Sequence, residues 1–535
     1  MAWADQVQWL GPVSVAILTL ATVRLLLARS PNTAQVRLWE SLDAVGVGQR
    51  GSFFSWMRAI VGSLTSTAQR TREGYARFCK SQNRPFALPS LWTGRAVVVL
   101  PPSLLPLLNR PESELAAHRA QLDTIQLPYM MADPDVYDNP IHFDIVRRSM
   151  SRKDVGALAA VTAEELHAAF TAYWGLDADN WVKLNNWDAC GRVMTRAAMR
   201  ALVGVPLCRD ERLLDWSRKY ASAVIAGTAF INCLPPVLRP YIGPLFGMRA
   251  KHYQAHCLTI MEPVIKERIQ MWEQSKGVMG EQDDFLQWTI MRCAKAGPEQ
   301  MDPTRIAMRL LGLATMSVMG MVYVLAHCIP DLYGSRSTND FVAGLEAECR
   351  NVAAAFPTTA ASLASNEALH GLYRVDSTLR ESMRLSNISV TSLARDVIVD
   401  DMDLGLAENL YKIPQGVRLV FPTQDIHRDE SIYETPLDFD AFRFSRAFEG
   451  NEHKSDREAV ASTTCSPSFL VFGYGRRACP GRWYAMQTLK QTLAYIVLHY
   501  DVELIGKPRE RRALLNVMVP QQDLEIRIRR KPIST

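Results

Sequence analysis

Residues 472–481 are Phe472-Gly473-Tyr474-Gly475-Arg476-Arg477-Ala478-Cys479-Pro480-Gly481, and this stretch decides the fold. Gly473 and Gly475 lack a Cβ, so their backbone can approach a large flat ligand closely. Arg477 offers a planar fork of donors that suits a carboxylate. Cys479 is the one nucleophilic side chain of the stretch. The combination predicts a cysteine presented to a planar, acidic ligand.

A helix is expected directly after Cys479. Apolar residues recur at helical spacing, at Trp483, Met486, Leu489, Leu493, Ile496 and Tyr500. Pro480 has no N–H to donate and marks the turn into this helix. The sulfur would then lie near a helix N-terminus, where free N–H groups and the helix dipole favour a thiolate over a thiol.

The stretch resembles the F-x-x-G-x-R-x-C-x-G signature of the cytochromes P-450, the haem-thiolate monooxygenases. Phe472, Gly475, Arg477, Cys479 and Gly481 occupy its defining positions. The resemblance implies haem b, with Cys479 as axial iron ligand and Phe472, Gly473, Gly475, Arg477 and Gly481 around the cofactor. No C-x-x-C-H motif is present, so covalent attachment is not expected. The alternative is a glycine-rich turn with a buried structural cysteine.

A second mark is Glu381-Ser382-Met383-Arg384 in a helical stretch, where i and i+3 side chains share a face. Alone, such a pair is common on solvated helices. Here Arg443 follows downstream, and by resemblance to the family Glu381, Arg384 and Arg443 form a structural cluster behind the haem. Ala441 stands where most of the family has proline.

Other segments resemble a filamentous-fungal branch that acts in secondary metabolism. They are Asp138-Asn139-Pro140 with His142 and Arg147, then residues 204–209, and Ser466-Pro467. The same matching makes Arg147 or Arg148, together with Arg395, further partners of the haem propionates, although isolated arginines are more often surface charges.

Composition fits a large globular enzyme, with 48% hydrophobic and 21% charged residues. No linker or internal repeat interrupts the chain. We expect a mainly α cytochrome P-450 fold with a small β-rich lobe and an N-terminal transmembrane helix, divided into a membrane anchor at 1–30 and a haem-thiolate catalytic domain at 31–535. The net charge of +5 is mild and scattered, which gives no support to nucleic-acid binding.

The membrane segment is predicted at Trp9–Ala28, whose twenty residues would span roughly 30 Å as a helix. Positive charges follow this segment and do not precede it, so the positive-inside rule places the catalytic domain in the cytosol. A cleaved signal peptide is the alternative, but the basic n-region is missing. We expect a single-pass protein of the endoplasmic reticulum membrane.

Ile306 to Ala326 is apolar except for Arg309, Thr315 and Ser317, which predicts a buried helix. Its length would also allow a second membrane span. The resemblance makes it the helix that crosses the distal haem face, where relatives carry an acid or histidine followed by threonine that relays protons. One alignment, on Leu311-Gly312-Leu313, places Met319 and Gly320 at that pair. A rival alignment keeps Thr315 and loses the acid.

In either alignment the usual pair is incomplete, because methionine, glycine and alanine offer neither acid nor hydroxyl. Protons would then come through water or a substrate hydroxyl, or Ser317 would substitute. Met319 and Gly320 would otherwise only shape a pocket for a bulky substrate. Another outcome is a reaction without hydroxylation.

The function expected from the resemblance is oxidation of a lipophilic secondary metabolite, terpenoid-like or similar, with O2. Apolar residues in 230–246 and at Tyr129-Met130-Met131 favour such a substrate, in the regions of the family's access loop and pocket roof. No dinucleotide fingerprint is evident. Electrons would therefore come from NADPH through a separate NADPH-cytochrome P-450 reductase, with cytochrome b5 as a further donor. The alternatives are isomerisation, dehydration or ring formation on the same fold, and a non-catalytic haem-binding sensor.

Overall fold

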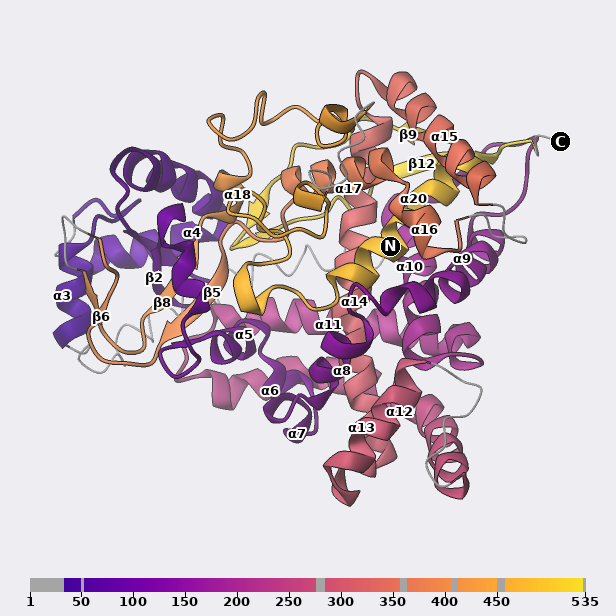
Figure 1. Ribbon diagram of the computed structural model, residues 1–535. Coiled ribbons are helices and arrows are strands. Elements are labelled where there is room, and N and C mark those ends of the chain that lie inside the picture. The colour runs from indigo at the N-terminus through magenta and orange to yellow at the C-terminus, as the bar shows by residue number, and fades with distance from the viewer. Residues whose placement is uncertain are drawn as a thin grey trace.

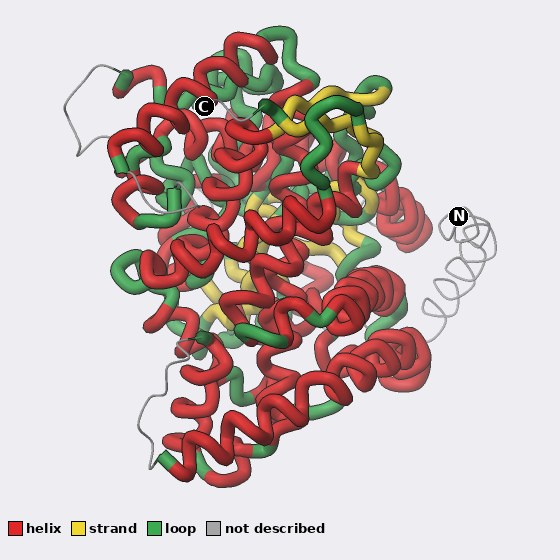
Figure 2. The backbone as a smooth tube through the Cα atoms, turned by 90° about the vertical axis from the view of Figure 1, so that its right-hand side faces the viewer, coloured by secondary structure: helices red, strands yellow, loops and turns green. Residues whose placement is uncertain are grey.

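The protein is described by a computed structural model over residues 33–49, 52–275, 284–356, 363–406, 411–449 and 458–532. Its backbone is mainly helical, with the strands confined to limited areas among the helices (Figure 2). This confirms the expected mainly α class with a smaller β-rich part. The anchor predicted at Trp9–Ala28 lies outside the described residues.

The helices differ widely in length, from single turns to α12 and α14, which are the longest. Their bounds are α3 Thr33–Ser41, α4 Phe53–Gly74, α5 Ala117–Ile125, α6 Leu127–Met130, α7 Asp135–Asp138, α8 Ile141–Ser149, α9 Ala159–Tyr173, α10 Asn186–Val203, α11 Glu211–Cys233, α12 Arg239–Gln274, α13 Phe285–Ala296, α14 Pro303–Tyr333, α15 Thr338–Ala355, α16 Asn366–His370, α17 Tyr373–Leu385, α18 Thr423–Ile426 and α20 Arg482–His499.

The largest sheet has the strand order β1-β2-β8-β5-β3, in which only β2 and β8 run parallel. A three-stranded antiparallel sheet has the order β4-β12-β9, and two short hairpins pair β6 with β7 and β10 with β11. The strand bounds are β1 Phe86–Ser90, β2 Arg95–Val99, β3 Leu115–Ala116, β4 Val182–Asn185, β5 Ser392–Val397, β6 Met402–Asp403, β7 Lys412–Ile413, β8 Arg418–Phe421, β9 Tyr500–Ile505, β10 Ala513–Leu514, β11 Val517–Met518 and β12 Glu525–Arg530.

Helix α14 runs through the middle of the molecule (Figure 1). Asp302 caps its start by accepting the N–H of Arg305, and Pro303 takes the first turn, where no N–H is needed. Among the described residues, α14 is the one helix long and apolar enough to cross a membrane, yet 61% of its apolar window is buried in the protein. It packs against α10, α11, α12 and α17. Burial on these sides makes it a core helix of this domain.

Helix α20 follows Cys479 at the predicted place, beginning at Arg482 and ending at His499. Its apolar side packs against α9, α15 and α17. Strand β5 ends at Val397, and residues 398–401 form the turn that leads to β6. The stretch 230–246 is also more helical than a loop, since only residues 234–238 separate α11 from α12.

Candidate functional site

The loop before α20 is folded by its own backbone. The N–H of Cys479 donates to the carbonyl of Phe472 at 2.7 Å, which brings the two ends of the loop together. Gly473 and Gly475 have φ of +87° and +65°, in the left-handed region that favours glycine. A Cβ on Gly475 would also lie 2.4 Å from Oδ1 of Asn109. A side chain at Gly475 is therefore excluded both by conformation and by space.

The Cys479 side chain is exposed, although the loop and α20 surround it with protein. Burial raises the pKa of its thiol, and this effect outweighs the opposite effects of the Gly481 and Arg482 N–H groups and of the Arg482 charge. The helix start thus favours the thiolate as expected, but not enough to prevail over desolvation. An accessible sulfur with a raised pKa lies on an internal surface, where a bound cation would stabilise its thiolate form.

Arg395 on β5 is buried, with 7% of its surface exposed. Its Nη1 donates to the carbonyls of Ala394 at 2.9 Å and Leu393 at 3.4 Å. Within the described part of the chain it makes no direct ion pair, and burial lowers its pKa. Leu393 also lies 3.8 Å from the place where a Cβ on Gly473 would stand, so β5 adjoins the cysteine loop. A buried arginine without a carboxylate partner fits an anionic ligand group here.

Two other predicted arginines have protein carboxylates as partners. Arg477 lies 2.9 Å from Glu112, whose other oxygen accepts the N–H of Ala117 at the start of α5. Arg147 lies on the exposed side of α8 and donates to Asp144 at 3.1 Å. Their assignment to a ligand's carboxylates stays a prediction. Gly481 faces α8, since its missing Cβ would stand 3.8 Å from Val146.

The structure brings Glu381, Arg384 and Arg443 together. Arg384 donates to both oxygens of Glu381 at 2.8 Å, and Arg443 donates to Oε1 of Glu381 at 3.0 Å. Arg384 also donates to the carbonyls of His427 and Pro436. Glu381 and Arg384 are fully buried. Every charge of this cluster is therefore matched by a partner within the protein.

One turn in the middle of α14 faces open space. Met316 is 49% exposed, and a Cβ on Gly320, one turn later on the same face, would meet no atom within 4 Å. One turn earlier, the methyl of Met131 lies 3.3 Å from where a Cβ on Gly312 would stand. One turn later, Tyr323 is buried against Val390 and Met518. The opening is therefore limited to about one helical turn.

The other predicted residues of α14 lie around this opening. Met319 and Ser317 are half-buried beside it. Thr315 is buried, and its hydroxyl donates to the carbonyl of Leu311 at 2.9 Å. Thr315 directly precedes Met316, so its side chain leaves the helix about 100° away from that of Met316.

Residues 157–528 match the family described as Cytochrome P450. The chain belongs to the cytochrome P450 family. It is 34% identical over 525 residues to cytochrome P450 monooxygenase gloP of Glarea lozoyensis, covering 94% of this chain and 93% of the relative. It is 33% identical to cytochrome P450 monooxygenase htyF of Aspergillus rugulosus, over 93% of this chain and 73% of the relative. The enzyme class is accordingly a cytochrome P450 monooxygenase.

Membership of the cytochrome P450 family implies a haem held by a cysteine thiolate, and the residues present fit it. Cys479 offers an accessible sulfur, and the positive φ of Gly473 and Gly475 folds the loop that presents it. Arg395 supplies a buried positive charge for a propionate. In such a family member the open turn of α14 would provide the opposite wall of the haem site.

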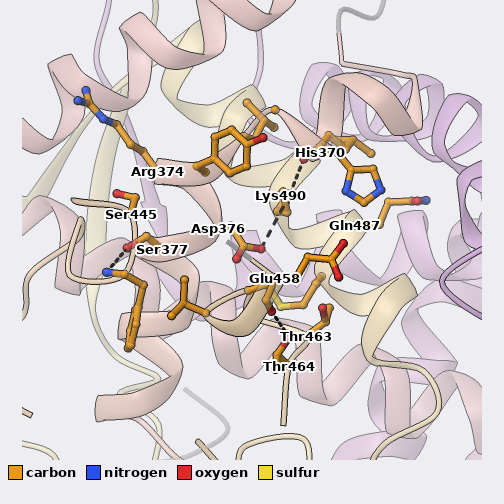
Figure 3. A pocket seen from close by; sticks show the side chains of 18 of the residues that line it. His370, Arg374, Asp376, Ser377, Ser445, Glu458, Thr463, Thr464, Gln487 and Lys490 are labelled. Carbon is orange, nitrogen blue, oxygen red and sulfur yellow. Dashed lines mark hydrogen bonds and ion pairs between the residues drawn. The ribbon is translucent and has the colours of Figure 1, made fainter. Parts of the chain in front are cut away.

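A cavity of about 1120 Å³ lies elsewhere in this P450, along α20 beyond Trp483 (Figure 3). Asp376, Lys490, Gln487 and His370 point into it from α17, α20 and α16. Its lining includes neither Cys479 nor any residue of α14. This cavity is thus separate from the cysteine site.

Two residues of the site could not be singled out from the sequence patterns. Met316 was not singled out, although its spacing of four from Gly320 places both on one helix face. Glu112 lies in a turn without a motif, and no local pattern links it to Arg477, which is distant in sequence.

Proposed function

We propose that the protein is a membrane-anchored monooxygenase that oxidises a lipophilic secondary metabolite, terpenoid-like or similar, in a fungal pathway. The proposal rests chiefly on one observation, the accessible sulfur of Cys479 beside the buried charge of Arg395. The relatives gloP and htyF are fungal P450 monooxygenases. In this proposal haem b, when bound, supplies the iron at which O2 is activated, with a thiolate that raises its electron density.

The chain's own residues bind, orient and exclude water. Met316 and Met319 give the open turn of α14 an adaptable apolar surface, and Gly320 leaves room for a bulky group. Met131 closes the opening at Gly312. A pocket with these walls suits an apolar substrate, because it offers few polar partners for a sugar or nucleotide.

Protons would reach the site through water or through a substrate hydroxyl. Neither Met319 nor Gly320 can carry a proton, and the Thr315 hydroxyl is already bonded to Leu311. Ser317 is the nearest candidate hydroxyl on α14 for holding a relay water. Electrons would come from NADPH through a separate cytochrome P-450 reductase, with cytochrome b5 as a second donor.

The membrane part of the proposal is supported by a row of exposed apolar residues at the start of α12. Tyr241, Leu245 and Met248 recur at spacings of four and three, which places them on one side of the helix, and the exposed Val237 lies in the turn just before it. Tyr241 is 78% exposed and Leu245 65%. Together with the predicted anchor at 1–30, this row would hold the catalytic domain on the cytosolic face of the endoplasmic reticulum.

The membrane proposal is tested by fractionation of yeast microsomes. Removal of residues 1–28 should release much of the protein with its haem site intact, and the double change Tyr241→Ser and Leu245→Ser should release the remainder. Leu437→Ser, at a site with 68% exposure outside this row, is the matched control. Full solubility after the truncation alone would contradict the membrane contact of α12.

The reaction itself is tested by reconstitution with a reductase, NADPH and labelled O2, with candidate lipophilic metabolites as substrates. The proposal expects consumption of NADPH and one labelled oxygen atom in the product. A specific observation favours a second function, since Met316, Met319 and Gly320 offer no acid or hydroxyl for oxygen activation. Product formed without label would establish isomerisation, dehydration or ring formation. Absence of any NADPH-dependent turnover would revive a haem-binding sensor.

A further inference from the structure

Three properties together distinguish Met316 from Met319, the other methionine at the opening on α14. It is in the middle of a helix that α10, α11, α12 and α17 surround. Its side chain is nevertheless 49% exposed. It shares its face with Gly320, where an added Cβ would meet no atom of another element within 4 Å. The thioether therefore projects from a largely buried helix into the opening beside Gly320.

This space is closed on both sides along α14. Met131 covers Gly312 one turn before Met316, and Tyr323 is buried one turn after Gly320. A molecule that fills the opening must contact Met316. Without such a molecule, the most exposed oxidisable group in the opening is the sulfur of Met316. Met319 at the edge of the opening is less exposed, and Gly320 has no side chain.

A thioether accepts an oxygen atom readily, and the product, methionine sulfoxide, is polar and chiral where methionine is apolar and flexible. The proposed function brings O2 and two electrons to this wall. The opening also lacks an acid or hydroxyl on Met319 and Gly320 that would tie oxygen activation to a bound substrate. When the enzyme turns over without substrate, the sulfur of Met316 is therefore available to accept the oxygen atom.

We propose that Met316 is a site of self-sulfoxidation, which the enzyme oxidises when it turns over without substrate. The inference rests on the proposed monooxygenase function. One atom of O2 forms the S=O bond of Met316, and the other leaves as water after the O–O bond breaks. Two electrons come from NADPH and two from the sulfur, and two protons are taken up. The sulfoxide places a polar group on the apolar wall and disfavours the lipophilic substrate.

The experiment is peptide mass spectrometry of the full-length holoenzyme after incubation with reductase, NADPH and 18O2, with catalase present and substrate absent. We expect 18O in the Met316 peptide, several-fold above that in the Met271 peptide. Met271 on α12 is the internal control because it is 58% exposed and diffusible peroxide should oxidise it ahead of Met316. Methionine sulfoxide reductase should reverse the label.

Matched variants complete the test. Met316→Leu keeps an apolar side chain of similar volume, and it should lose the labelled peptide and retain activity longer during substrate-free incubation. Met271→Leu should behave as the wild type. The inference would be overturned if the Met271 peptide, from the more exposed side chain, carried more 18O than the Met316 peptide. It would also be overturned if NADPH and O2 were consumed and the Met316 peptide carried no 18O. If NADPH were not consumed at all, the proposed function would fail first and the inference with it.

Discussion

The two walls of the cysteine site differ in whether their side chains find partners within the protein. Behind the Cys479 loop, Glu381 and Arg384 are fully buried, and each has its partners within 3.0 Å. On the wall that the family resemblance assigns to α14, Met316 is half exposed and the space beside Gly320 is open. The first wall is fixed before any ligand is present, while the second depends on what fills it. Structural specificity and substrate specificity are thus carried by different sides.

The largest effect is expected from Arg384→Ala. The change leaves the buried Glu381 carboxylate with only Arg443 and the N–H of Asp440 as partners, and it frees the carbonyls of His427 and Pro436. Breaking a buried pair in this way typically costs about 3 to 5 kcal/mol. Urea unfolding and haem content should both show the loss.

The matched control is Arg446→Ala, whose partner Asp440 lies 2.8 Å away but whose side chain is 62% exposed. Exposed pairs contribute about 0 to 1 kcal/mol. If Arg384→Ala and Arg446→Ala were equally stable, the contrast between a satisfied buried wall and the rest of the molecule would be wrong.

A smaller effect should appear as pH falls. Burial, with the nearby charge of Arg384, lowers the pKa of His427 to about 3, while its Nε2 accepts the N–H of Leu470. The unfolded chain takes up a proton below about 6.5 and the folded one does not, so stability is lost as pH falls from about 6.5 towards 3. At pH 5 the loss is about 2 kcal/mol.

The comparison is made with His427→Gln, whose unfolding free energy should fall less between pH 7 and pH 5. His142 on α8 provides a second test next to α14, since burial and the charge of Arg309 on α14 also lower the pKa of His142 to about 3. Similar slopes for His427→Gln and His142→Gln are expected because burial dominates both. An unchanged slope in both variants would refute the assignment of two buried neutral histidines.

The sequence predicted the first wall well because its residues are fixed by chemistry at short spacing. Gly475 must have positive φ, and Glu381 and Arg384 lie one helical turn apart, so each leaves a local signal. Helices α14 and α20 followed from apolar periodicity. The Glu112 partner of Arg477 had no such signal, because a turn and a loop far apart in the chain meet only in the folded protein.

The second wall was less predictable because it is defined by missing contacts. Periodicity places Met316 and Gly320 on one face, but not whether Met131 or open space lies over that face. The pKa of Cys479 gives a related case, since the helix start could be predicted and the amount of burial that outweighs it could not.

The smallest effects on stability are expected on α14. Gly320→Thr adds a hydroxyl where open space exists, and it should change the free energy of unfolding by no more than about 1 kcal/mol. With poor substrate analogues, it should reduce the share of NADPH electrons lost to hydrogen peroxide, or else block binding. Thr315→Ala should leave this share unchanged, because its hydroxyl is bonded to Leu311. If Thr315→Ala lost many NADPH electrons to hydrogen peroxide while Gly320→Thr had no effect, the rival alignment that keeps Thr315 as the relay residue would be correct.

The account depends most on Cys479 as the iron ligand, and the reduced carbon monoxide complex tests it directly. Wild-type protein and Cys465→Ala should show the red-shifted Soret band of thiolate ligation, since Cys465 is a half-buried neighbour without the glycine loop. Cys479→Ala should lose that band together with all activity. A red-shifted band retained in Cys479→Ala would contradict the account.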